Sequence, residues 1–262
     1  VWYLFIWKWL FDLFPVLREP STVFGWIVIW VLAINPFHQH FQSHQVQIFL
    51  AGVVFLAEYL RTREKPNEFL AGFLILFAGM AKLFPGIVAF FYLLLWRKRL
   101  TQGMVAGFIF SLVWPLVWFG PSGGLYLYGE FLHGLTVYNT LPGPGSDLVF
   151  GLEFASIPAI VARITASLSV RPWSPIISFV INLSIVIAFG YVVIKRRASI
   201  LTNRRISARY WAMAVTMSVL LFPGTRTSYF MFLLPGFAAL VDLFKCSGNR
   251  SYRLTSIVVL LV

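Results

Sequence analysis

Ten apolar runs, separated by short polar connections, constrain this chain more than any other feature of its sequence. The hydrophobic residues make up 59% of the 262 residues and the charged residues 11%, whereas soluble domains average roughly 45–50% and about 25%. A soluble fold of this size has too little interior for so much apolar surface, so the sequence predicts that lipid is its main solvent. The runs cover residues 1–17, 22–36, 46–60, 69–81, 84–96, 100–119, 175–194, 208–222, 228–244 and 254–262. We therefore expect an all-α, polytopic transmembrane helical bundle with about ten spans, forming a single transmembrane domain over 1–262.

The connections between these runs are of two chemical kinds, which alternate along the chain. The basic kind holds, with Arg18, 16 of the 21 Lys and Arg residues: Arg61, Arg63, Lys65, Arg97, Lys98, Arg99, Lys195, Arg196, Arg197, Arg204, Arg205, Arg209, Lys245, Arg250 and Arg253. The other kind is rich in His, Gln, Asn, Pro and Gly, and comprises 35–45, 82–85, 120–174 and 223–227. Basic loops stay in the cytoplasm, so this alternation predicts a multi-pass protein of the cell membrane whose functional face is extracytoplasmic. The net charge of +12 is loop charge of this type and does not indicate nucleic-acid binding.

Two pairs of runs are too short to be ordinary spans. Residues 84–96 give a helix of only ~20 Å, against a hydrocarbon core of about 30 Å. Since 69–96 begins and ends beside basic loops, it is predicted to form a hairpin that turns at Lys82–Pro85. Residues 208–244, which turn at 223–227, repeat this pattern. Irregular backbone at membrane depth is tolerated where it lines a cavity, so the two turns predict an outward-facing, partly submerged cavity.

The longest of the outer connections is the extracytoplasmic loop 120–174. Its segment 142–146 reads as a flexible joint. Residues 122–138 are predicted to form an interfacial helix, with Tyr126, Tyr128, Phe131 and Leu135 on its apolar face.

The connection from Asn35 to Gln47 carries three histidines and several amides. Imidazoles suit zinc or copper, but the spacings match no zinc motif and no carboxylate or cysteine accompanies them, so no metal and no cofactor is expected. Two interpretations remain: a polar loop that solvates a helix end, or a ligand site at which His44, Gln45 and Gln47 bind sugar hydroxyls or a phosphate.

Lys82 and Arg226 are cations at the two submerged turns. A cation at membrane depth is costly and suggests function, although a snorkelling side chain is the alternative. Because the guanidinium matches phosphate oxygens, the two residues are candidates to clamp one anionic head group.

The carboxylates are interpreted mainly as structural or solvated groups. Lys8 and Asp12, spaced i, i+4, are expected to neutralise each other within the first run. Glu58 and Asp242, near the cytoplasmic ends, are expected to be solvated. On the outer side, any of Glu130, Asp147 and Glu153 is a possible general base.

At these turns the sequence resembles the polyprenol-phosphate-sugar-dependent glycosyltransferases of family 87, which have the GT-C membrane architecture. The resemblance covers about 22–245. The first matching motif is Asn35-Pro36 followed by 43–47, where the family often has Gly-Gln-x-Asn. The second is the hairpin with Lys82-x-x-Pro85, which ends at the basic residues of 96–99. The third is the turn 223–227, which leads to Leu233-Leu234-Pro235.

This resemblance implies an inverting hexosyltransferase, with mannose the expected sugar, that uses a polyprenyl-phosphate donor and a lipid or glycan acceptor outside the cytoplasm. Lys82, Arg226, His44, Gln45, Gln47 and Asn35 would bind donor phosphate or sugar. The family's catalytic Asp lies in its first outer loop, which would precede Val1, so we expect the chain to be a fragment without its general base. The chain departs from the family pattern at His44-Gln45-Val46-Gln47, which puts the choice of substrate in doubt.

Two other functions fit the hydropathy pattern. A secondary transporter also has broken helices and an outward cavity, but the sequence shows no inverted repeat and few charges within its spans. A non-catalytic membrane scaffold would leave the two charged hairpins unexplained.

Overall fold

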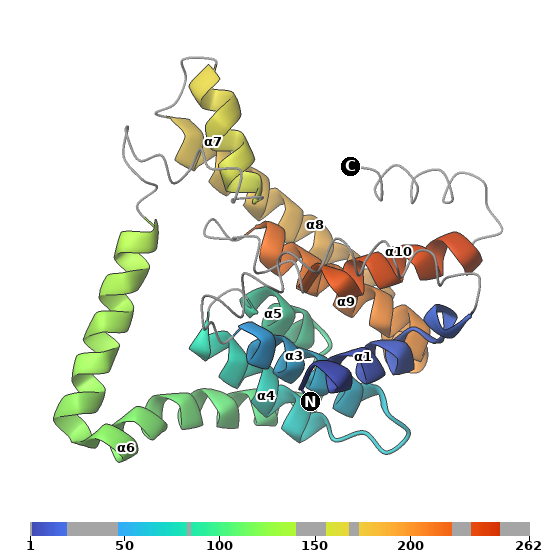
Figure 1. Ribbon diagram of the computed structural model, residues 1–262, viewed down its shortest axis with the longest axis horizontal. Helices are drawn as coiled ribbons and strands as arrows, with labels where there is room; N and C mark the ends of the chain where they lie inside the picture. Colours follow the sequence, from blue (N-terminus) through green and yellow to red (C-terminus); the bar gives the residue numbers. More distant parts are fainter. Residues whose placement is uncertain are drawn as a thin grey trace.

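The computed structural model describes residues 2–19, 47–82, 85–139, 156–167, 173–221 and 232–246. Within these ranges the regular structure is entirely helical, which confirms the all-α prediction for the described part of the chain (Figure 1). The elements are α1 (Trp2–Leu13), η1 (Pro15–Arg18), α3 (Gln47–Thr62), α4 (Glu68–Ala81), α5 (Gly86–Leu94), α6 (Lys98–Asn139), α7 (Ile157–Ser167), α8 (Ser174–Thr202), α9 (Arg204–Leu220) and α10 (Leu234–Cys246).

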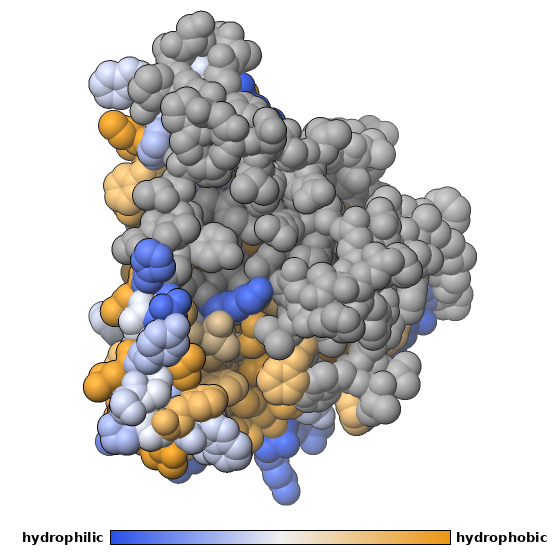
Figure 2. Space-filling view, turned by 60° about the vertical axis from the view of Figure 1, so that its left-hand side comes forward, coloured by the Kyte–Doolittle hydropathy of each residue, from blue (hydrophilic) through white to orange (hydrophobic). Residues whose placement is uncertain are grey.

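Two of the described helices, α6 and α8, are long and apolar enough to cross a membrane. Both expose rows of large hydrophobic side chains, among them Trp114 and Val117 on α6 and Phe179 and Ile187 on α8. Figure 2, which brings the α6 side forward, shows such side chains gathered on that face. The other described helices have 9 to 17 residues, fewer than the ~20 of a full span. The structure thus supports two spans by length and composition, not the predicted ten.

Helices α4 and α5 form the hairpin that the short apolar runs predict. Helix α4 has 14 residues and α5 has 9, and the backbone between them turns at Lys82 and Pro85. Pro85 precedes the first residue of α5, where its fixed φ suits a helix start and its missing N–H costs no hydrogen bond.

Helices α4 and α6 run side by side in the same direction at very close range. A Cβ added at Gly103 would meet the carbonyl oxygen of Phe69, and one at Gly107 would meet that of Phe73. The spacing Gly103-x-x-x-Gly107 is the small-residue motif that lets helix backbones touch in membranes. Gly72 of α4 makes the reciprocal approach to Leu100.

Helix α6 bends sharply at Gly120, whose φ of 73° and ψ of 166° lie outside the helical region and suit glycine alone. The second arm, residues 121–139, turns away from the first (Figure 1). Tyr128 on this arm donates its hydroxyl hydrogen to the carbonyl oxygen of Leu112 on the first arm. The helix predicted at 122–138 is therefore confirmed within this arm, and α7 is a second helix within the connection 120–174, whose extracytoplasmic position stays a prediction.

The buried core is formed mainly by α1, α3, α5 and α9. Trp211 of α9 is fully buried and packs edge-on against Phe55 of α3, with ring centroids 5.2 Å apart. Small residues such as Ala208, Ala212 and Ala214 line the rest of this helix's buried face. Helix α9 is thus the central element around which the shorter helices pack.

The basic connections meet at one end of the molecule, called here the basic end: residues 61–65, 97–99, 195–209 and 245. Arg61 donates to Ser207, and Arg197 donates to the carbonyl oxygens of Leu95 and Trp96. Arg205 donates to Asp242, three residues before Lys245. These contacts confirm that the four basic connections share one end of the fold.

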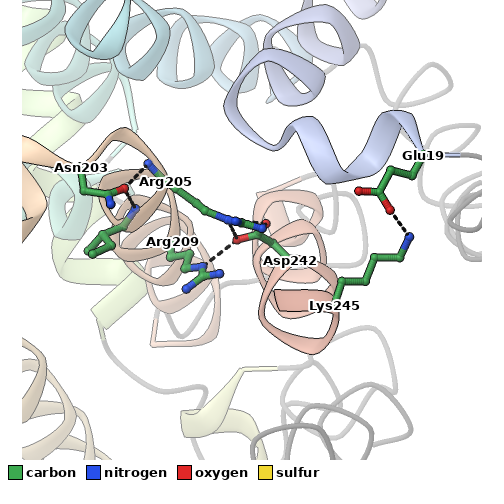
Figure 3. Close-up of polar contacts among 7 residues, drawn as sticks. Glu19, Asn203, Arg205, Arg209, Asp242 and Lys245 are labelled. Atoms are coloured by element: carbon green, nitrogen blue, oxygen red, sulfur yellow. Dashed lines mark hydrogen bonds and ion pairs between the residues drawn. The ribbon is translucent and has the colours of Figure 1, made fainter. Parts of the chain in front are cut away.

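The carboxylates at the basic end are buried, and the expectation that Glu58 and Asp242 are solvated is wrong. Glu58 accepts two hydrogen bonds from Arg61, of 2.6 and 2.8 Å, and one of 3.0 Å from the Tyr92 hydroxyl. The Asp242 side chain is 1% exposed and is held by Arg205 and Arg209 of α9, with the closest N–O distances 2.5 and 2.7 Å (Figure 3). A buried carboxylate needs a hydrogen-bonded cation to offset its lost hydration, and each of these two carboxylates has one or two arginines in that role.

Two further ion pairs involve the N-terminal segment. Asp12 pairs with Arg18 rather than with Lys8, whose side chain is exposed, so the predicted pair within α1 is wrong. The chain turns into η1 after Leu13, and this turn brings Arg18 back to Asp12. Lys245 bonds Glu19 at 2.7 Å and so ties α10 to the segment after η1 (Figure 3).

Candidate functional site

Lys82 is the one predicted site residue whose surroundings the structure describes. Asn35, His44, Gln45 and Arg226 lie outside the described residues, as do the turn 223–227 and the joint 142–146. Gln47 is the first residue of α3, and its side chain is not described. The structure therefore neither brings these six residues together nor separates them.

Lys82 terminates α4 at the end of the molecule opposite the basic end. Its backbone is extended, with φ −151° and ψ 132°, and its N–H bonds the carbonyl oxygen of Ala78. The side chain is half-buried. Since α4 is entirely uncharged between Glu68 and this residue, Lys82 is the cation at the apolar end of the helix.

An apolar groove of about 440 Å³ is lined on one side by Ala81, the residue that precedes Lys82. Its walls are the last turns of α4, including Phe77 and Ala81, and both arms of α6. The lining residues are Phe77, Met80, Ala81, Phe108, Ser111, Leu112, Trp114, Pro115, Leu127, Tyr128, Phe131 and Leu132. The groove exists because α6 bends at Gly120, which brings its second arm back over the end of α4.

Ser111 and Tyr128, the two lining residues with polar side chains apart from the Trp114 indole, are already hydrogen-bonded. Ser111 donates to the carbonyl oxygen of Gly107 at 2.8 Å, and Tyr128 to that of Leu112. Neither hydroxyl has its hydrogen available for a ligand. The groove thus suits a hydrocarbon chain, and its volume is within the range of ligand sites in proteins, roughly 300–1,000 Å³.

Sequence reasoning identified the second arm of α6 but not the groove that it closes. The signal was the apolar face formed by Tyr126, Tyr128, Phe131 and Leu135. This pattern does not reveal which surface the arm will cover, because that depends on the packing of α4 against the first arm of α6.

Of the three possible general bases, Glu130 alone lies within the described residues. Glu130 is exposed on the second arm of α6, while Asp147 and Glu153 lie outside the described residues. Within the described ranges no three His, Cys, Asp or Glu side chains gather in a metal-binding arrangement. The three histidines between Asn35 and Gln47 are outside those ranges.

Comparison with known proteins assigns the chain to a family. No curated protein and no solved structure gives a match. The model of glycosyltransferase family 87 matches residues 1–223, which include α1 to α9 and the Lys82 hairpin. This match covers most of the 262 residues, and it favours a glycosyltransferase over a transporter or a scaffold. The chain belongs to glycosyltransferase family 87.

Proposed function

We propose that this glycosyltransferase moves a hexose, with mannose the first candidate, from a polyprenyl-phosphate donor to an acceptor hydroxyl on the extracytoplasmic side of a membrane. The observation that carries the proposal is an apolar groove lined by α4 as far as Ala81, the residue directly before the cation Lys82. A polyprenyl phosphate is an anion joined to a long hydrocarbon. The cation Lys82 matches the anion, and the apolar groove matches the hydrocarbon.

The groove supports a lipid-linked donor rather than a soluble nucleotide sugar. Its lining is almost wholly hydrocarbon and aromatic, and it opens beside exposed apolar side chains of α6 such as Phe108 and Trp114. A polyprenyl chain can enter such a groove from the lipid phase without crossing water. A nucleotide would bring polar groups that nothing along this lining satisfies.

The proposed reaction is a single displacement with inversion at the anomeric carbon. The acceptor oxygen attacks that carbon while the bond from the carbon to the phosphate oxygen breaks, and the electron pair of that bond leaves with the polyprenyl phosphate. The acceptor proton passes to a carboxylate acting as general base. This carboxylate is proposed to be the Asp that the family resemblance implies. The leaving group is already a stable anion and needs no general acid.

Lys82 and Arg226 are proposed to stabilise the negative charge that develops on the leaving phosphate. A cation placed in advance at a dry site lowers the barrier because it needs no reorganisation during the reaction. Asn35, His44, Gln45 and Gln47 are proposed to bind sugar or phosphate oxygens. The basic end is proposed to face the cytoplasm, which leaves the Lys82 turn on the outer side.

The experiment is transfer of radiolabel from polyprenyl-phosphate-[¹⁴C]mannose, and in parallel from the glucose donor, to extractable product in membranes that contain the full-length protein. Transfer that depends on the protein supports the proposal. Transfer from a nucleotide sugar in the absence of the lipid donor would contradict it, as would protein-dependent uptake of labelled solute into vesicles without transfer.

A further inference from the structure

The N-terminal third of α8 carries a row of polar side chains whose oxygen atoms are buried. Ser174, Ser178 and Asn182 are spaced four residues apart, so they lie on one face of the helix over about 12 Å. Ser174 and Ser178 are 4% and 5% exposed. Helix α8 ends at the basic end, so this row lies on the half of the helix that is distant from it.

Three atoms of this row have no hydrogen-bond partner within the part of the chain that the structure describes: Oγ of Ser174, Oγ of Ser178 and Oδ1 of Asn182. A buried polar atom without a partner is destabilising, and such atoms are rare in native proteins. Three of them on one helix face need a common explanation.

Three other serines of the described helices behave differently. Ser184, two residues beyond the row, donates to the carbonyl oxygen of Val180 at 2.7 Å, and Ser111 and Ser218 also donate to backbone oxygens of their own helices. This local bond is the usual way for a serine to be satisfied in an apolar helix. Ser178 has the carbonyl oxygen of Ser174 one turn before it and does not use it.

Asn182 is fixed at one end of its amide. Its Nδ2 donates to the carbonyl oxygen of Leu221, at the end of α9, at 3.1 Å. This bond orients the amide and leaves Oδ1 as an unused acceptor on the helix face that carries the two serines. A positioned side chain of this kind loses little entropy when it binds a ligand.

We propose that Ser174, Ser178 and Asn182 form a track that binds the hydroxyl groups of a sugar. Each serine hydroxyl both donates and accepts, and the amide oxygen accepts, so a row of sugar hydroxyls satisfies all three atoms. The inference rests on the proposed function, since both substrates of that reaction present hydroxyl groups. The sugar belongs either to the donor or to the acceptor, and the two sources share this chemistry.

The test uses the full-length protein and the variants Ser174→Ala, Ser178→Ala and their combination. Ser184→Ala is the matched control, because it removes an exposed hydroxyl from the same helix. Initial rates are measured with the donor and then the acceptor varied, and Tm is measured for each variant. The double variant is expected to raise one KM by about tenfold or more, corresponding to ~1.4 kcal/mol, while Tm stays constant or rises because two unsatisfied hydroxyls are gone.

A rise confined to the donor KM assigns the track to the transferred hexose, and a rise confined to the acceptor KM assigns it to the acceptor. Unchanged KM for both substrates overturns the proposal and leaves the row as a site for ordered water. A loss of activity in the variants that also have a lower Tm overturns the proposal as well, because the hydroxyl groups would then stabilise the fold rather than bind sugar.

A binding readout separates this proposal from the proposed reaction. Saturation-transfer NMR of the purified protein with methyl α-mannoside is expected to show a signal in wild type and Ser184→Ala and none in the double variant. If wild type transfers no sugar but this pattern holds, the reaction fails and the track stands. Equal signals in all variants would refute the track whatever the enzyme assay shows.

Discussion

Arg61 and Glu58 form a bidentate ion pair that is closed off from solvent, with side-chain exposures of 7% and 0%. The pair lies on the last turns of α3 and connects through Tyr92 to α5 and through Ser207 to α9. One guanidinium and one carboxylate thus join three helices at the basic end.

Arg61→Met is expected to destabilise the fold by about 3–5 kcal/mol, because it leaves the Glu58 carboxylate buried without its cation. The combined variant Arg61→Met/Glu58→Leu should recover most of that loss, since an apolar pair of similar size needs no counter-charge. Unfolding in a mild detergent, followed by circular dichroism, measures both. Arg99→Met, which removes an exposed cation from the same end, is the control; an equal loss for Arg99→Met would show that burial is not the cause.

Gly103→Leu is expected to separate α4 from α6, because even a Cβ at this position would lie 1.9 Å from the carbonyl oxygen of Phe69. Gly129→Ala is the control, since nothing lies within 4 Å of its Cβ and alanine favours a helix by roughly 1 kcal/mol. Thermal unfolding should show a large fall in Tm for the first variant and none for the second. A Tm unchanged by Gly103→Leu would contradict the close packing of the two helices.

Tyr128→Phe is expected to loosen the second arm of α6, because the hydroxyl that bonds Leu112 is lost. Spin labels at the exposed positions 117 and 132 report the angle between the arms. Double electron–electron resonance should give one narrow distance in wild type and a broader distribution in the variant. A distribution of the same width would show that Gly120 alone sets the bend.

The sequence predicted the hairpin of α4 and α5 and the helix after Gly120 because both follow from local signals. An apolar run that is too short, a proline at a turn and a glycine at a break are visible in a single chain. The sequence also predicted that the basic connections share one end. They alternate with the non-basic connections along the chain, so each predicted helix joins one kind of connection to the other.

The errors concern charged side chains whose partners or burial depend on how the chain folds back and packs. Asp242 reads as a solvated carboxylate because its partners Arg205 and Arg209 lie 37 and 33 positions away. Glu58 also reads as a solvated carboxylate, because the local sequence does not show its burial with Arg61 under α5 and α9. Asp12 pairs with Arg18 and not with Lys8, because the chain turns back at η1. Helical periodicity does not reveal that turn.

The membrane orientation is open to direct labelling. With Cys246 replaced, single cysteines at positions 41 and 130 are expected to react with an impermeant maleimide from the extracytoplasmic side, and a cysteine at position 98 only from the cytoplasmic side. Labelling of positions 41 and 98 from the same side would refute the predicted topology.

The two proposed phosphate ligands differ in chemistry. Arg226→Met is expected to weaken donor use strongly, with only partial recovery in Arg226→Lys, because an ammonium lacks the planar pair of donors. Donor kinetics of the full-length protein measure this. Full activity of Arg226→Met would leave the residue as a helix-end anchor.

The most direct measurement of the central claim is the rate of sugar transfer by full-length Lys82→Met as polyprenyl-phosphate-hexose is varied. The loss of a charge-assisted contact to phosphate, of about 1.5–3 kcal/mol, predicts a decrease in kcat/KM for the donor of roughly 10- to 100-fold. Tm should be unchanged, and Lys8→Met, which removes an exposed cation elsewhere, should behave as wild type. Near-normal donor kinetics for Lys82→Met would contradict the account, because Lys82 would then be a snorkelling side chain and the groove beside it would have lost its link to the donor phosphate.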